Sequence, residues 1–130
     1  MPNLPKQPRP TNNHAIRRAW ANERTAARHA RTAGNTGAEW GHLERAHILS
    51  QPLMAAHVRT HLAMLGFAIR HRDSHEIAGQ MARLLVAGPG SAAGRYPLGN
   101  TGGANVNAVA PMPIPSDVQA ILDGTAAAAS

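Results

Sequence analysis

The 130-residue sequence contains no cysteine, which excludes disulfide bonds, thiolate metal sites and cysteine nucleophiles. Aromatic residues are also scarce: there are two Trp, one Tyr and one Phe. The core must therefore be built from small aliphatic side chains, which let helices pack closely. No apolar run approaches the roughly 18 residues of a membrane-spanning helix, and the proline-rich first ten residues do not form a secretory signal. We therefore expect a single all-α domain in the cytoplasm.

Acidic side chains are the minority, since 7 Asp and Glu face 13 Lys and Arg and leave a net charge of +6. The excess lies in residues 1–31, which hold seven basic side chains and one acidic one, whereas the rest of the chain is balanced. Helical periodicity places four of these basic residues on one face: Arg17, Arg24, Arg28 and Arg31. No interleaved aromatic residues or recognition motif accompany them. We therefore expect this face to contact solvent or a protein partner rather than nucleic acid.

Hydrophobic periodicity and turn residues predict four long helices, a Pro/Gly-rich loop that wraps them, and a short final helix. The expected helices cover about residues 12–33, 37–50, 52–71, 74–87 and 116–123, and the loop covers residues 88–115. Residues 1–11 and 124–130 are expected to be disordered. Short connections make successive helices antiparallel neighbours, so we expect two helical hairpins. The second hairpin is weakly similar to a tetratricopeptide repeat.

Three histidines and two glutamates fall on helix faces that should be buried. Glu44 and His47 are three residues apart on one predicted helix, and His57 and His61 are four apart on the next. Glu23 lies in the middle of the apolar face of the first helix. Imidazole and carboxylate donors suit zinc, iron, nickel or copper. We predict a metal site built from Glu44, His47, His57 and His61, with Glu23 as a fifth candidate ligand.

The same side chains also have a purely structural interpretation. A buried histidine is satisfied by one hydrogen bond to a glutamate, for example His57 by Glu44 or His47 by Glu23. The protein would then be a tetratricopeptide-like adaptor that binds another protein in its helical groove. No catalytic signature or cofactor motif appears, so an enzyme is not favoured. The glycine-containing segment 100–105 is better explained as a structural turn than as an anion cradle.

Three strings in the sequence carry a resemblance to a known family. They are HLERAHIL at 42–49, HVRTHLAML at 57–65, and GNTGGANV at 99–106 followed by PMPIP at 111–115. Together they resemble a bacterial domain of unknown function, family 3703, over about residues 14–122. The family has no established activity. The resemblance therefore implies only that the histidine-bearing helices and the Asn-Gly loop belong to one structural unit.

Overall fold

The computed structural model describes residues 4–8, 12–107 and 110–125, and it confirms an all-α fold. Its helices are α1 (Asn13–Thr32), α2 (Thr36–Ser50), α3 (Met54–Arg70), α4 (Ser74–Ala92) and α5 (Ser116–Leu122). Extended pairing within these residues is limited to an isolated bridge between Lys6 and Arg95. None of the helices in the described part of the chain is both long and apolar enough to cross a membrane.

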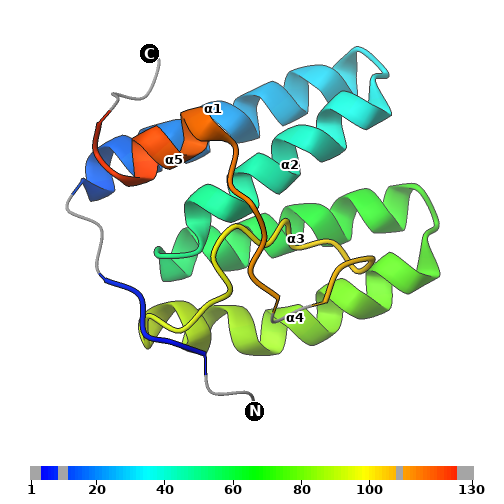
Figure 1. Cartoon of the computed structure of the whole chain (residues 1–130). Coiled ribbons are helices and arrows are strands. Elements are labelled where there is room, and N and C mark those ends of the chain that lie inside the picture. Colours follow the sequence, from blue (N-terminus) through cyan, green and yellow to red (C-terminus); the bar gives the residue numbers. More distant parts are fainter. Residues whose placement is uncertain (1–3, 9–11, 108–109, 126–130) are drawn as a thin grey trace.

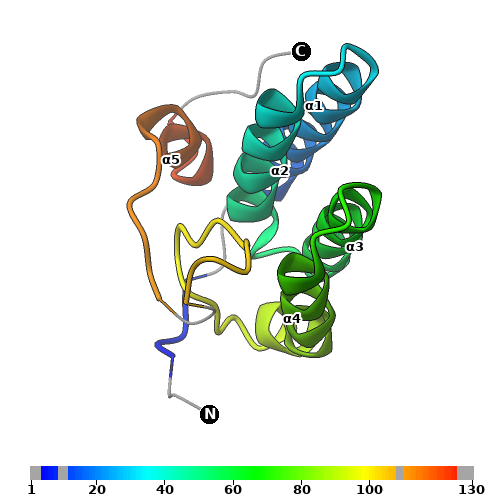
Figure 2. The same ribbon diagram turned by 90° about the vertical axis from the view of Figure 1, so that its right-hand side faces the viewer.

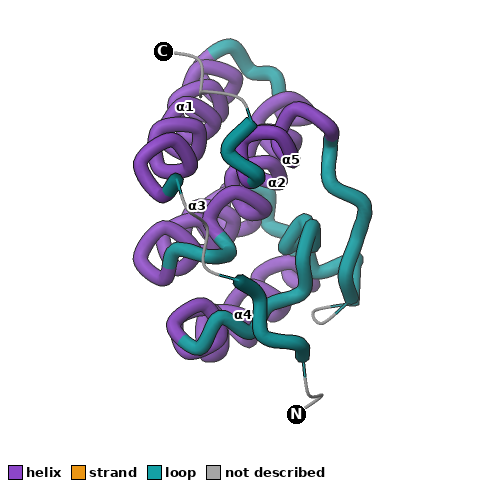
Figure 3. Tube along the Cα trace, turned by 60° about the vertical axis from the view of Figure 1, so that its left-hand side comes forward, coloured by secondary structure: helices purple, strands orange, loops and turns teal. Residues whose placement is uncertain are grey.

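The four long helices form two stacked hairpins, α1 with α2 and α3 with α4 (Figures 1 and 2). The two hairpins meet through α2 and α3, and α5 packs against α1 and α2. The long connection between α4 and α5 lies along one face of both hairpins, as the tube in Figure 3 shows. This topology brings a loop late in the sequence next to helices from the first part of the chain.

Side-chain caps fix where three of the helices begin. Asn12 accepts a hydrogen bond from the backbone N–H of Ala15 at the start of α1, and Asn35 accepts one from Ala38 at the start of α2. At the start of α4, the Asp73 side chain accepts a hydrogen bond from the backbone N–H of Glu76. Such caps satisfy donors that a helix start leaves unpaired and contribute about 1 kcal/mol each. Short polar turns can therefore separate the helices cleanly.

The fourth helix is longer than predicted. The Gly88–Pro89 pair predicts an end at residue 87, but α4 continues to Ala92. A proline adopts a helical φ and removes only its own backbone donor, although its ring also crowds the preceding turn. In this chain that cost does not end the helix, so the wrapping loop begins later than expected.

Part of the N-terminal arm packs against the chain just after α4. The backbone N–H of Gln7 donates to the carbonyl of Gly94 at 2.7 Å, and the Arg95 guanidinium donates to the carbonyl of Leu4 at 2.8 Å. These contacts differ from the disorder predicted for residues 1–11. The rest of that prediction, residues 1–3 and 9–11, and most of the predicted C-terminal tail, residues 126–130, lie outside the described residues.

Two apolar clusters hold the helices together. The first joins α1, α2 and α5 through side chains that include Ile16, Leu49 and Val118. The second joins α1, α2 and α3 around Leu43 and Met64, with further apolar side chains packed against it. Burial of each such large side chain contributes about 1.5–3 kcal/mol. The clusters fix α2 against α3, the two helices that carry the buried histidines.

Candidate metal centre

Three histidine rings converge inside the molecule. His47 comes from α2, and His57 and His61 come from successive turns of α3. The Nε2 atom of His47 lies 3.0 Å from that of His57 and 3.1 Å from that of His61, and the Nε2 atoms of His57 and His61 are 3.2 Å apart. The three residues are 3%, 6% and 2% exposed, respectively. Three ring nitrogens therefore meet at one buried point.

The nitrogen triangle has the size that a small metal ion requires. The centre of a triangle with these sides lies about 1.8 Å from each corner, slightly less than a zinc–nitrogen bond of about 2.0–2.1 Å. The Nε2 atoms of His47, His57 and His61 would therefore be able to hold one such ion together.

Hydrogen bonds fix which nitrogen of two rings carries the hydrogen. The Nδ1 atom of His47 lies 2.6 Å from the backbone carbonyl of Asn100, which can only accept, so Nδ1 is the donor. The Nδ1 atom of His61 lies 2.6 Å from the Gln80 side-chain oxygen. The Gln80 nitrogen faces two acceptors, the Glu76 carboxylate and the Gly102 carbonyl, so its oxygen must face the ring. When these rings are neutral, both Nε2 atoms bear lone pairs.

The lone pairs of His47 and His61 therefore point at each other across 3.1 Å with no hydrogen of their own between them. Burial lowers the pKa of His47 well below its ordinary value, and the neighbouring His57 and His61 lower it further. Burial also lowers the pKa of His61, against the opposing effect of the Gln80 hydrogen bond. Both rings are neutral at pH 7, which is the form that binds metal.

The segment Gly99–Ala104, called the cover loop below, lies over the histidines and is organised by Asn100. The Asn100 side-chain amide donates to the carbonyls of Asn107 and Ala110, and its oxygen accepts from the N–H of Gly102. Asn100 is 1% exposed, and its own carbonyl accepts the His47 hydrogen. One residue thus holds the loop together and orients a histidine.

Glycines let the cover loop approach the centre closely. A Cβ atom on Gly102 would lie 2.6, 2.7 and 2.9 Å from three atoms of the His47 ring, and Gly102 has a φ of +86° that favours glycine. On the opposing helix α4, a Cβ on Gly79 would lie 2.5 Å from that of Ala104. Any side chain at either position would push the loop away from the helices.

Glu76 on α4 anchors the far end of the cover loop. Its carboxylate oxygens accept from the backbone N–H of Ala104 at 3.0 and 2.9 Å, and one of them also accepts from Gln80. Glu76 is only 5% exposed. The same network of buried polar groups therefore holds both His61 and the loop.

Of the five predicted ligands, the structure brings the three histidines together and places the two glutamates outside their group. Glu44 is half-buried beside Thr101 of the cover loop. Burial raises the pKa of Glu44, the Thr101 hydroxyl lowers it, and the charge of Glu76 raises it. Glu23 accepts from His42 at 2.6 Å and from Arg45 at 2.8 Å, so its carboxylate ties α1 to α2.

The predicted basic face is exposed on α1. Arg17, Arg28 and Arg31 lie in solvent, whereas Arg24 lies over the Trp20 ring with its guanidinium carbon 5.6 Å from the ring centre. Burial lowers the pKa of Arg24, and the nearby positive charges of Arg28 and Arg59 lower it further. Positive charges therefore cluster along this face of α1.

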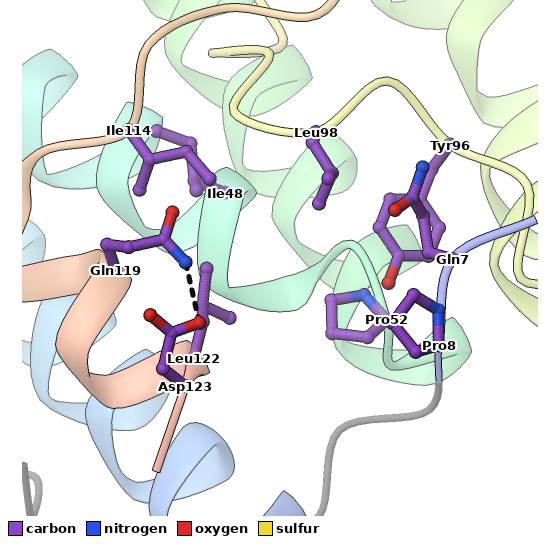
Figure 4. A pocket seen from close by; sticks show the side chains of 10 residues that line it. All are labelled: Gln7, Pro8, Ile48, Pro52, Tyr96, Leu98, Ile114, Gln119, Leu122 and Asp123. Atoms are coloured by element: carbon purple, nitrogen blue, oxygen red, sulfur yellow. Dashed lines mark hydrogen bonds between the residues drawn. The ribbon is translucent and has the colours of Figure 1, made fainter. Parts of the chain in front are cut away.

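A cavity of about 260 Å³ lies elsewhere, between α5, the end of α2 and the two ends of the wrapping loop (Figure 4). Ile48, Leu98, Ile114 and Leu122 point into it and make its walls largely apolar. None of the three histidines lines this cavity. Among the residues that the structure describes, the group of side chains close enough to hold a metal ion is this enclosed histidine centre.

Fold and site together define a small all-α protein with a buried three-histidine cluster under a glycine-rich loop. The chain belongs to the family of proteins of unknown function DUF3703, whose sequence model matches residues 14–122. The matched span contains all three histidines and the whole cover loop. No curated protein and no solved structure matches the chain.

Proposed function

We propose that this protein binds one divalent transition-metal ion through the Nε2 atoms of His47, His57 and His61. The convergence of these three atoms within 3.0–3.2 Å of one another supports the proposal. Neutral imidazoles suit zinc, copper, nickel and iron, whereas magnesium and calcium prefer oxygen donors. Zinc accepts tetrahedral geometry with nitrogen bonds of about 2.0–2.1 Å, so it is the ion chosen for the first test.

The surroundings of the rings support the same function. Ligating histidines generally donate their second ring hydrogen to a carbonyl or carboxylate, which orients the ring and increases its basicity. His47 and His61 do this to Asn100 and Gln80. Three protein ligands leave a fourth position for water or another ligand, which is typical of sites that exchange ligands rather than of closed structural sites. We therefore infer a metal-handling accessory role for the protein.

Metal content of protein purified without an affinity tag tests the proposal. After equilibration with zinc and removal of free metal, we expect one ion per chain by elemental analysis. Because loss of an outer-shell partner already costs about 10- to 100-fold in affinity, loss of a ligand in His57→Ala or His61→Ala should cost more. His29→Ala, on the exposed surface of α1, is the matched control and should bind like wild type.

Substoichiometric zinc that does not change when His57 and His61 are both replaced by Ala would contradict metal binding. The histidines would then be structural. The tetratricopeptide-like adaptor would become the hypothesis to test, by identifying proteins captured from the source cells.

A further inference from the structure

The three-histidine centre is surrounded by three helices and one loop. His47 comes from α2, His57 and His61 from α3, and Gln80 from α4, while the cover loop supplies the remaining contacts. Buried apolar clusters join α2 to α3, and α3 and α4 pack side by side as a hairpin. Separation of these helices would break that packing, whereas the cover loop is held to them mainly by hydrogen bonds. The loop is therefore the part of the enclosure that opens at the lowest cost.

A small set of polar contacts latches the cover loop to the helices. The Thr101 hydroxyl lies beside the Glu44 carboxylate of α2 and lowers its pKa. The Gly102 carbonyl accepts from Gln80 of α4 at 2.8 Å, and the Ala104 N–H donates to Glu76. These few hydrogen bonds together contribute less to net stability than the whole fold does, so the loop can release without global unfolding. The latch is thus weaker than the packing around it.

The closed position of the cover loop and the metal-binding orientation of the His47 ring depend on each other. Gly102 lies so close to the His47 ring that a Cβ there would overlap three ring atoms, and the adjacent Asn100 carbonyl accepts the ring hydrogen. A His47 ring turned away from the other two histidines would lose this bond and occupy the space of the loop. The loop can close only when His47 faces the centre.

We propose that the cover loop is the gate of the metal centre, and that its opening sets the rate at which metal enters and leaves. This inference rests on the proposed function. The apolar cavity of Figure 4 offers no alternative route, because none of its lining residues belongs to the histidine group. On this proposal, metal exchange passes through the latch formed by Thr101, Gly102 and Ala104.

Exchange kinetics of the whole protein with cobalt(II) test the gate. Stopped-flow absorption follows cobalt uptake, and a chelator added in excess follows its release. Thr101→Val removes the hydroxyl beside Glu44 while keeping the shape of the side chain. Since the loop loses a polar contact with a carboxylate of α2, we expect both rates to rise about threefold. The dissociation constant should change much less than either rate.

Gly102→Ala tests the contact with His47, and Gly41→Ala is its matched control. An added Cβ at Gly102 overlaps the ring, whereas one at Gly41 of α2 meets nothing within 4 Å. We expect Gly102→Ala to speed cobalt uptake and to increase hydrogen exchange at the Gly102 and Ala104 amides. Gly41→Ala should leave both unchanged. If Gly102→Ala does not fold, Thr101→Val alone decides.

The possible results separate the two proposals. A wild-type protein that takes up no cobalt or zinc overturns both metal binding and the gate. Normal binding with equal exchange rates in wild type and Thr101→Val overturns the gate alone. Faster release without faster uptake also overturns it, because the loop would then act only on affinity. Faster exchange in both directions supports it.

Discussion

Gln80 is the residue whose replacement tests the polar network most directly. It is fully buried and makes three hydrogen bonds, from His61 at 2.6 Å, to Glu76 at 2.6 Å and to the Gly102 carbonyl at 2.8 Å. Gln80→Leu keeps a similar volume and removes all three. His61 and the Gly102 carbonyl each lose this partner at a cost of about 1–3 kcal/mol, while Glu76 keeps its bond from Ala104 and the leucine gains about 1–2 kcal/mol of apolar burial. We expect a net loss of about 3 kcal/mol in unfolding free energy.

Urea denaturation of the metal-free protein, followed by circular dichroism, measures this loss. For a chain of this size the midpoint should fall by about 2 M urea. Zinc affinity, measured separately by competition with a chelator, should fall about 10- to 100-fold because His61 loses the group that fixes its hydrogen. The matched control is Gln119→Leu, which removes only an exposed hydrogen bond to Asp123 and should change neither quantity. Wild-type stability and affinity in Gln80→Leu would refute the assigned network.

Three further predictions follow from the same contacts. The metal-free protein should lose stability as the pH falls below about 6.5, because the unfolded chain then binds protons at His47 and His61. The folded state does not bind them, since the pKa values of both residues are lowered there. Urea midpoints at pH 7.5 and 5.5 measure this loss, and equal midpoints would contradict it. Gly79→Ala should destabilise the protein because the added Cβ meets Ala104, whereas Gly66→Ala, which has open space, should stabilise it by about 0.5–1 kcal/mol. Thermal unfolding of both variants gives the comparison, and equal shifts in unfolding temperature would contradict the prediction. Glu23→Gln should lower the free energy of unfolding by about 1 kcal/mol by weakening the contacts with His42 and Arg45. Zinc affinity in the competition assay should not change, and a tenfold loss of affinity would restore Glu23 as a ligand.

The helices and the histidine positions were predictable because both are local properties of the sequence. Gly34 takes a φ of +72° just after α1, so the turn there has a clear signal. His57 and His61 occupy adjacent turns of one helix face, and helical spacing alone indicates that they share a site. The predicted end of α4 was wrong because it depends on more than the local sequence. Whether a helix tolerates a Gly-Pro pair is decided by what surrounds the helix.

The outer contacts of the centre could not be predicted because they join distant parts of the chain. Asn100 acts on His47 through a backbone carbonyl, which every residue possesses and which leaves no signal in the sequence. Gln80 could have been noticed as a polar residue on the inner face of α4, but its partners are set by tertiary packing. Glu23 was expected inward with the metal, yet packing of α1 on α2 places it against Arg45.

The number of available hydrogens separates metal binding from a purely structural role for the three histidines. The ring hydrogens of His47 and His61 are both committed to Asn100 and Gln80, so neither can be donated into the centre. His57 can supply at most one hydrogen through Nε2 to two facing lone pairs. Extra protonation is disfavoured, because burial lowers the pKa of both acceptors. A metal ion satisfies all three nitrogens at once. In a metal-free centre, the Nε2 atoms of His47 and His61 must share the single hydrogen that His57 can supply.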